Sequence, residues 1–436
     1  MKKIILAVIT VMGVVTILGL VINAIPKESS SDDLKTEKNN DGDMKYIAYG
    51  STSNYENGYF YIKDDHNIMF FDYDTQKEVY LCNKPNCKHE DNTCSSYLEI
   101  GESNELFYYD HHLYLINAQA SGSIMSITGH GDDIVSEDQN GTPSTVYRMN
   151  LDGTNKEKLF VAPTGTEMSM PYVIKGNVLY GFLQNYKTEQ KGNNSFASVM
   201  TDSKLVAIDL DTGKYEEIMD GVNKELVAVY DNQLVIQEIE YKNDPALYDD
   251  DPAGYIDNLY DSKTRVQLIN IDTKKADTVY DGSYKDVNTL RFYKDRMYFV
   301  GKDSNNLEYM NLATKERKTI TELPKSGMEL SQIIDDKLLV YDYKDQEAHI
   351  GDAYVMDLNT KEMKEFALKD DNEYLVEILS GNDEYYFVQT ENILGEEYTT
   401  WAGTRQQDII GIRYGLIKKA DYWASQPNYI LMRNAE

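Results

Sequence analysis

The chain consists largely of short runs in which apolar and polar residues alternate, and tight polar turns separate many of these runs. Six of the separating stretches share a pattern: an Asp or Asn, an apolar or aromatic residue, a small or polar residue, and then Thr or Gly, with a Lys nearby in most of them. They are residues 72–77, 150–153, 209–214, 270–274, 311–315 and 357–361. Alternation predicts strands, and Asn, Asp, Thr and Gly are the residues that tight turns prefer. The six stretches therefore predict β-hairpins.

Seven aromatic-rich apolar runs accompany these turns. They are residues 59–62, 113–116, 178–182, 234–236, 297–300, 338–341 and 385–388. The first six pair with the six turns, and the seventh pairs with a divergent end at 412–417 and 429–432. The units begin near Lys45 and are about 55 residues long, enough for a four-stranded blade with insertions. We predict an all-β fold, a β-propeller with seven four-stranded blades; six or eight blades are the alternatives.

Strand alternation within such blades divides the connections between two faces. We name the strands of a blade A to D from the centre outward. The short A-to-B links and the tight C-to-D turns lie on one face, the turn face. The B-to-C links lie with the D-to-A links on the other, the long-loop face. Four B-to-C links are long: 118–144, 184–203, 241–264 and 390–408. Because a plain scaffold needs no such asymmetry, we expect function on the long-loop face.

The N-terminus carries an apolar segment. Ile4 to Ile25 follow Lys2 and Lys3 and are long enough to cross a bilayer as a helix. The two lysines favour a cytoplasmic N-terminus, hence a single-pass signal anchor in residues 1–25. A cleaved signal peptide, which releases a secreted protein, is the alternative. Residues 26–44 are almost entirely polar and are expected to form a disordered linker, which leaves 45–436 as an extracytoplasmic propeller domain.

Composition restricts the partners. The formal net charge is -30, with 73 Asp and Glu against 43 Lys and Arg. Nucleic-acid binding needs clustered positive charge, which the sequence lacks, so nucleic acid is excluded as a partner. The high count of 36 Tyr agrees with a strand-rich fold.

All three cysteines fall within one short segment that also contains a histidine: Cys82, Cys87, His89 and Cys94. Three thiolates and an imidazole form a complete tetrahedral ligand set for a structural Zn²⁺ ion. In an exported protein, one disulfide with a spare thiol is the alternative, and an iron–sulfur or redox-active site is a third interpretation. The cluster lies in the first D-to-A link, so we expect it at the rim of the long-loop face.

The long loops contain weaker candidates for ligand contact. A metal site is one interpretation of His130 with Asp132, and an ordinary Gly-rich loop is the other. A second candidate is an acidic group formed by Asp249, Asp250 and Asp251, with Asp244 and Asp257 nearby. Its carboxylates are interpreted either as ligands for Ca²⁺ or as part of a solvated acidic loop. Trp401 beside Tyr398 is suited to stacking on a sugar ring or to packing on the rim. No known nucleophile or metalloprotease motif is present.

The segment from Leu81 to His89, together with the repeats, resembles exported TolB-like and low-density-lipoprotein-receptor-like propellers of Gram-positive anaerobes. One family of unknown function among them carries such a Cys/His cluster after its first blade. The resemblance implies an extracytoplasmic propeller without an assigned activity. Two features depart from it: the Tyr-Trp-Thr-Asp run of the receptor propellers is absent, and TolB-like propellers have six blades. We expect a membrane-tethered, non-catalytic propeller that binds a protein or glycan; the alternative is an exported carbohydrate-active hydrolase or lyase that uses carboxylates on the long-loop face.

Overall fold

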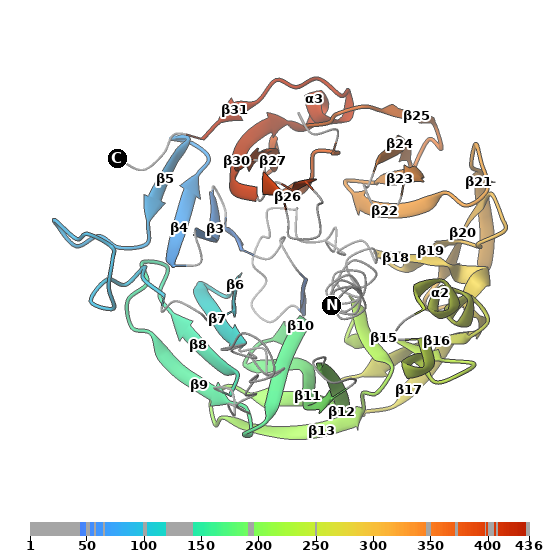
Figure 1. Cartoon of the computed structure of the whole chain (residues 1–436), viewed down its shortest axis with the longest axis horizontal. Helices are drawn as coiled ribbons and strands as arrows, with labels where there is room; N and C mark the ends of the chain where they lie inside the picture. Colours follow the sequence, from blue (N-terminus) through green and yellow to red (C-terminus); the bar gives the residue numbers. More distant parts are fainter. Residues whose placement is uncertain are drawn as a thin grey trace.

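The computed structural model describes residues 44–432 except 49–52, 56–57, 64–65, 99–102, 119–142, 191–195, 249–250, 346–349, 371–373, 397, 400–404 and 407–408. Seven four-stranded antiparallel sheets, one with an added inner strand, are arranged in a ring around a central axis (Figure 1). The seven-bladed propeller predicted from the repeats is therefore confirmed. Each blade follows the previous one in the chain, and we number them 1 to 7 in that order.

The strands of each blade run from the centre outward in sequence order. Blade 1 contains β2 (Asn54–Tyr55), β3 (Gly58–Lys63), β4 (Asn67–Asp72) and β5 (Lys77–Tyr80); blade 2 contains β6 (Ser103–Tyr109), β7 (His112–Ala118), β8 (Thr145–Met149) and β9 (Glu157–Val161); blade 3 contains β10 (Thr166–Lys175), β11 (Val178–Gln190), β12 (Phe196–Asp209) and β13 (Lys214–Asp220); blade 4 contains β14 (Lys224–Tyr230), β15 (Gln233–Glu240), β16 (Lys263–Asn270) and β17 (Ala276–Ser283). Blade 5 contains β18 (Thr289–Tyr293), β19 (Arg296–Val300), β20 (Asn306–Asn311) and β21 (Arg317–Glu322); blade 6 contains β22 (Glu329–Ile334), β23 (Lys337–Asp345), β24 (Ile350–Asp357) and β25 (Met363–Phe366); blade 7 contains β26 (Ile378–Gly381), β27 (Tyr385–Leu394), β30 (Ile409–Lys418) and β31 (Ile430–Leu431).

The polar turns are stabilised by the side chain of their first residue, which accepts hydrogen bonds from backbone N–H groups within the turn. In the β24–β25 turn, Asp357 Oδ1 accepts hydrogen bonds from the backbone N–H groups of Asn359 and Thr360 at 2.9 Å each. The Lys361 N–H then donates to the Asp357 carbonyl at 2.7 Å, with Lys361 in the left-handed region at φ 63°. The turns at Asn270 and Asn311 repeat this arrangement. The Asp/Asn-to-Lys pattern is therefore a local turn device, as predicted.

The ring closes through aromatic packing between the last blade and the first. In the described chain, no strand from one terminus completes a sheet of the other, so side chains must hold blades 7 and 1 together. Phe387 of β27 is fully buried, with its ring centroid 5.0 Å from that of Tyr59 and 5.1 Å from that of Phe71. Asn54 Nδ2 also donates to the Gly381 carbonyl across the same seam at 2.9 Å.

One short strand lies outside the predicted plan. β1 (Lys45–Ile47) pairs with β10, so that it becomes a fifth, innermost strand of blade 3 (Figure 1, dark blue beside β10). The expectation that the first unit begins near Lys45 is therefore wrong, because blade 1 begins only at β2.

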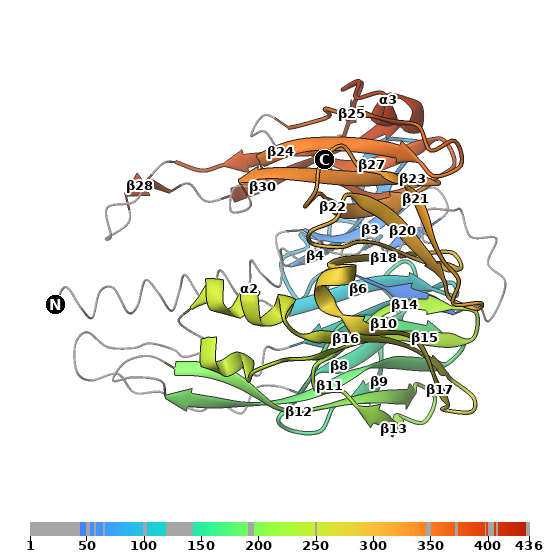
Figure 2. The same ribbon diagram turned by 90° about the vertical axis from the view of Figure 1, so that its right-hand side faces the viewer.

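The insertions that the sequence assigned to the long-loop face project from one side of the ring in Figure 2. They are the end of the β11–β12 hairpin where the two strands connect, the segment with η2 (Pro245–Tyr248) and α2 (Pro252–Tyr260), and the small hairpin of β28 (Tyr398–Thr399) and β29 (Arg405–Gln406). Two further helical turns are η3 (Tyr284–Val287), after β17, and α3 (Lys419–Trp423), after β30. Most of the long link of blade 2 lies outside the described residues.

No helix among the described residues is long and apolar enough to cross a membrane. The apolar segment from Ile4 to Ile25 and the polar linker lie outside the described residues, so the anchor remains a prediction.

Candidate metal centre

The predicted Cys/His segment forms a compact loop between β5 and β6. Two local backbone hydrogen bonds shape it: Cys87 N–H to the Lys84 carbonyl at 3.2 Å, and Cys94 N–H to the Asp91 carbonyl at 3.0 Å. His89 adopts a positive φ of 58°, which reverses the chain between the second and third cysteines. These short turns bring residues that are up to twelve positions apart into one cluster.

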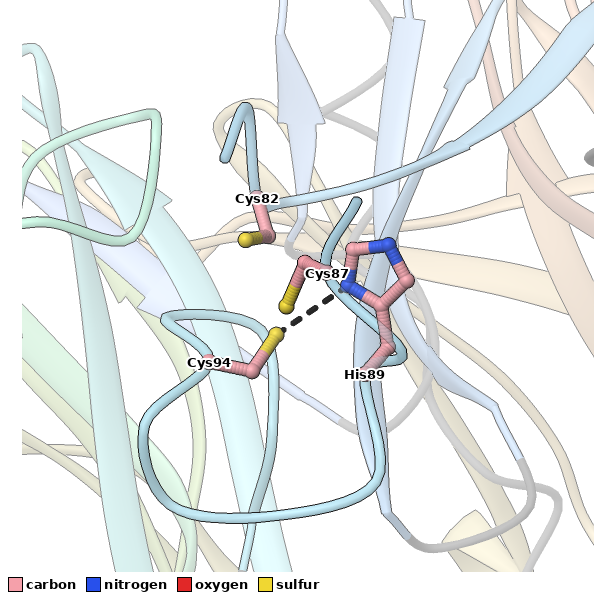
Figure 3. Close-up of side chains that lie close together, drawn as sticks. All are labelled: Cys82, Cys87, His89 and Cys94. Atoms are coloured by element: carbon pink, nitrogen blue, oxygen red, sulfur yellow. Dashed lines mark hydrogen bonds between the residues drawn. The ribbon is translucent and has the colours of Figure 1, made fainter. Parts of the chain in front are cut away.

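The four side chains converge on a common point (Figure 3). The sulfur atoms of Cys82, Cys87 and Cys94 and a ring nitrogen of His89 all lie within 4.8 Å of one another. His89 Nδ1 lies 3.1 Å from Cys94 Sγ. The three cysteines are free thiols, and His89 points into the cluster. Tetrahedral Zn²⁺ sites place sulfur at about 2.3 Å and nitrogen at about 2.0 Å from the ion, so this arrangement fits a metal such as zinc after a small contraction.

Neighbouring side chains fix the orientation of two ligands. The ring of Tyr80, at the end of β5, stacks on the His89 imidazole with centroids 4.0 Å apart and planes 4° apart. Cys94 is buried, and Ser96 Oγ lies 3.1 Å from its sulfur. Such neighbours around the ligands orient them before an ion arrives.

The thiols differ in acidity. Burial acts to raise the pKa of Cys82, but hydrogen bonds from the Lys84 backbone, the Cys94 thiol and Ser95 outweigh it and lower the pKa to about 7. For Cys87, the backbone N–H of His89 lowers the pKa, but burial and the adjacent thiols of Cys94 and Cys82 prevail and raise it. One thiolate therefore forms readily while a second is opposed, and a bound cation would remove this repulsion between thiolates.

The loop also joins two blades at the outer edge of the ring. Its Ser96 carbonyl accepts from the Ile68 N–H of β4 at 2.7 Å. On the other side, Ser95 Oγ lies 3.3 Å from the Asp152 carbonyl, in the β8–β9 turn of blade 2. The expectation of a site on the rim of the long-loop face is therefore too narrow, because the loop also contacts a turn of the opposite face. Outer strands are rotated relative to inner ones by the twist of each sheet, which brings the end of β5 toward this turn.

A glycine marks the contact between the loop and blade 2. Gly153 has φ 72°, and a Cβ atom there would lie 2.8 Å from the Ser95 carbonyl oxygen and 2.9 Å from that of Leu81. We expect Gly153→Ala to lower the free energy of unfolding by about 2–3 kcal/mol, since both strain and overlap with backbone atoms act. Gly165→Ala is the matched control: its φ is 81° but nothing lies within 4 Å. Urea denaturation of both variants measures the difference; equal costs would show that the seam contact contributes nothing.

The other predicted ligand residues are placed only in part. His130, Asp132, Asp249, Asp250 and Trp401 lie outside the described residues. Tyr398 is in β28, which pairs with β29 on the long-loop side. The side chain of Asp251 caps α2 by accepting from the Gly254 N–H at 3.0 Å, a role that needs no cation. Among the described residues, only the Cys/His set gathers three or more potential metal ligands.

A group of five glutamates at the inner strands was not predicted from the sequence. In five blades a Glu stands immediately before the first buried apolar residue of strand A, at its long-loop end. These A-strand glutamates are Glu105, Glu167, Glu225, Glu329 and Glu377, of blades 2, 3, 4, 6 and 7. The repeated Glu-apolar pair is the sequence signal for them, but it becomes visible only when the strands are aligned by blade.

Two neighbouring A-strand glutamates interact. Tyr172 donates to Glu105 Oε2 at 2.6 Å. Burial raises the pKa of Glu105 to about 7, and the charge of Glu167 adds to the effect, although the bonds from Tyr172 and the Met170 backbone oppose it. On blade 4, Glu225 is solvent-exposed, but desolvation by the many surrounding protein atoms raises its pKa, while the positive charge of Arg291 opposes the shift.

The raised pKa of Glu105 predicts a pH-dependent stability. The ordinary pKa is near 4.5 and the folded value is about 7. The stabilising contribution of the protonated form is therefore complete below about pH 4.5 and is lost as the pH rises through 7. We expect Glu105→Gln, which can still accept from Tyr172, to raise the free energy of unfolding at pH 8 by about 1–3 kcal/mol and to have little effect at pH 4. Denaturation at both pH values checks this, with exposed Glu365→Gln as control; an equal effect at the two pH values contradicts it.

Comparison with known proteins finds solved structures of low sequence identity. Neither a known family model nor a curated protein sequence matches the chain. Similar solved structures include an oligogalacturonate lyase in complex with manganese, with 12% identity, a TM-score of 0.47, and coverage of 87% of this chain and 92% of that one. An oligogalacturonate lyase from Vibrio parahaemolyticus shows 10% identity and a TM-score of 0.46, covering 81% and 92%. A puromycin-hydrolyzing peptidase from Mycobacterium tuberculosis shows 11% identity and a TM-score of 0.45, covering 94% of this chain and 56% of that one.

These values carry no conclusion about activity, and the assignment as a β-propeller rests on the seven sheets themselves. The resemblance to an exported family with a Cys/His cluster remains a prediction.

Proposed function

We propose that the protein is a membrane-tethered, extracytoplasmic propeller that binds a protein or glycan partner through its long-loop face, without catalysis. The observation that carries the proposal is the asymmetry of the ring. The turn face consists of short links, whereas the extended β11–β12 hairpin, η2 with α2, and the β28–β29 hairpin all project from the opposite side (Figure 2). A scaffold that only had to close on itself needs no such projections, and binding loops on a rigid frame are a common arrangement.

Two features of the long-loop face suit recognition. The first is an open groove of about 400 Å³ on blade 4, lined by Val222, Asn223 and residues 238–245. The second is the acidic character of the chain, which has a formal net charge of -30 and places the A-strand glutamates at the inner end of this face. A partner with positively charged groups is favoured by such a surface, because complementary charge guides association.

Within this proposal the Cys/His centre holds one Zn²⁺ ion and has a structural role. All four positions of a tetrahedral ion are taken by protein ligands, which leaves none for water or substrate. Cys82, Cys87, His89 and Cys94 would hold the ion, and the loop would be fixed in the seam between blades 1 and 2. The ion is thus assigned to the stability of the frame, and recognition to the projecting long loops.

The alternative is a carbohydrate-active hydrolase or lyase, and the A-strand glutamates keep it open because paired carboxylates can serve as acid and base. The two functions separate in a turnover assay. We expect the wild-type protein to cleave none of a panel of neutral and acidic oligosaccharides, as measured by new reducing ends or unsaturated products. Turnover that is lost in the triple variant Glu225→Gln, Glu329→Gln, Glu377→Gln, but kept in an exposed control set at Glu216, Glu316 and Glu365, would establish the enzyme instead.

A further inference from the structure

The inner strand β1 has a defined direction along the central axis. Its register with β10 is antiparallel, with Lys45 opposite Ile174 and Ile47 opposite Tyr172. β10 starts at the long-loop side and ends at Lys175, which the short A-to-B link follows on the turn face. β1 therefore runs the other way: the chain enters the channel at the turn face and proceeds toward the long-loop face.

Contacts at both ends of β1 agree with this direction. At its start, Lys45 Nζ donates to the Tyr108 carbonyl, one residue from the turn-face end of β6. Beyond the strand, Ser53 Oγ donates to the Leu106 carbonyl at 2.7 Å, in the middle of β6 and two residues further from its turn-face end than Tyr108. The first described residues therefore fix the point at which the preceding chain joins the propeller.

The strand is firmly held. Lys45 is 6% exposed and its Nζ donates to the Tyr108 carbonyl of blade 2 at 3.1 Å. Tyr46 OH donates to the Leu226 carbonyl of blade 4 at 3.2 Å, and Ile47 is fully buried. β1 is therefore joined to three blades at once, and detaching it would expose buried apolar surface and leave β10 unpaired on its inner side.

We propose that the propeller is oriented with its turn face toward the bilayer, so that the long-loop face, with the A-strand glutamates, is presented away from the membrane to a partner that arrives from outside. This inference rests on the proposed function, because it takes residues 4–25 as the anchor. It adds the orientation, which follows from the direction of β1. The surface offered to partners then contains the long loops and the A-strand glutamates, and the formal net charge of -30 favours a partner that carries positive charge.

The length of the predicted linker supports the orientation. Eighteen residues, 26–43, separate the predicted anchor from Met44. A polar chain of that length has a typical end-to-end distance of about 25 Å. To turn the propeller over, the linker would have to run outward across the turn face and then along the full height of a blade, and the ten residues of β10 alone span about 33 Å. The direct path from the turn face to the bilayer is therefore favoured.

Energy transfer to a labelled bilayer tests this orientation in the full chain. We place a fluorescent donor, through an unnatural amino acid that spares the cysteines, at exposed Lys214 at the start of β13 or at Leu247 in η2, which is 72% exposed on the long-loop side. The protein is reconstituted in phosphatidylglycerol-containing vesicles with an acceptor lipid. We expect transfer from Lys214 to exceed that from Leu247 several-fold. Equal transfer, or more from Leu247, overturns the orientation.

Two accompanying measurements distinguish a failure of the membrane anchor from a failure of the predicted entry point at the turn face. Vesicle flotation of the full chain against residues 44–436 tests the anchor: if both fail to float, the membrane tether is wrong and the orientation falls with it. Transfer between a label at residue 43 and the same two donors in detergent tests the entry point alone. A label closer to Lys214 supports entry at the turn face, and a label closer to Leu247 overturns it, whatever the flotation shows.

Discussion

Replacing Phe387 with alanine is expected to lower the free energy of unfolding by about 3–5 kcal/mol, the usual cost of removing a fully buried phenylalanine. The ring of Phe387 packs against Tyr59, Phe71 and Tyr414, with centroid distances of 5.0, 5.1 and 5.4 Å. Because no shared strand links blades 7 and 1 in the described chain, this aromatic cluster carries much of the closure of the ring. Urea denaturation, followed by near-ultraviolet circular dichroism, measures the loss.

The control is Tyr374→Ala, which removes an aromatic side chain that is 41% exposed and should cost less than about 1 kcal/mol. A cost below about 1 kcal/mol for Phe387→Ala as well would contradict the assignment of ring closure to this cluster. Limited proteolysis adds a second readout, since an opened ring should be cut first in blades 1 and 7.

The second large effect concerns the metal centre. We expect the wild-type protein, purified without oxygen, to contain one zinc per chain and Cys94→Ser to contain none, because the buried Cys94 sulfur lies beside both His89 and Ser96. The structural Zn²⁺ sites of small peptides are worth about 10–16 kcal/mol in apparent terms at neutral pH, of which a rigid propeller gains only a part as stability. The loop from Cys82 to Cys94 should therefore become sensitive to protease while the blades stay folded.

Lys88→Ala, an exposed change in the same loop, is the control and should keep the zinc. Thiol counting distinguishes the other interpretations of the cluster. Wild-type protein without zinc and with one free thiol would support the disulfide interpretation. Visible absorbance with bound iron would indicate an iron–sulfur site. Full zinc occupancy in Cys94→Ser would show that the ion, if present, is held elsewhere.

Features that depend on neighbours in the chain could be predicted from the sequence. The six turns are such a case, because Asp or Asn at the first position bonds to backbone groups two and three residues later. The Cys/His set is another, since its ligands lie within thirteen residues. Blade number followed from the repetition of these local units.

Features that depend on distant pairing could not be predicted. β1 is only three residues long, and its partner β10 lies beyond two complete blades, so nothing in the segment around Lys45 signals a strand of blade 3. The close contact of Gly153 with the backbone of Ser95 and Leu81 depends on the twist of two sheets. The A-strand glutamates were missed for a related reason: in a chain with 73 acidic residues, their common position becomes visible only from the strand register.

Site-specific photo-crosslinking in native membranes tests most directly the claim that the long-loop face binds the partner. A photoreactive amino acid is placed at Leu247, on the long-loop side, or at Lys214, on the outer strand of the neighbouring blade. We expect a discrete adduct from Leu247 that excess soluble propeller, residues 44–436, competes away, and no such adduct from Lys214. A competable adduct from Lys214 with none from Leu247 would contradict binding at the long-loop face, because the partner would then bind the face that we orient toward the membrane.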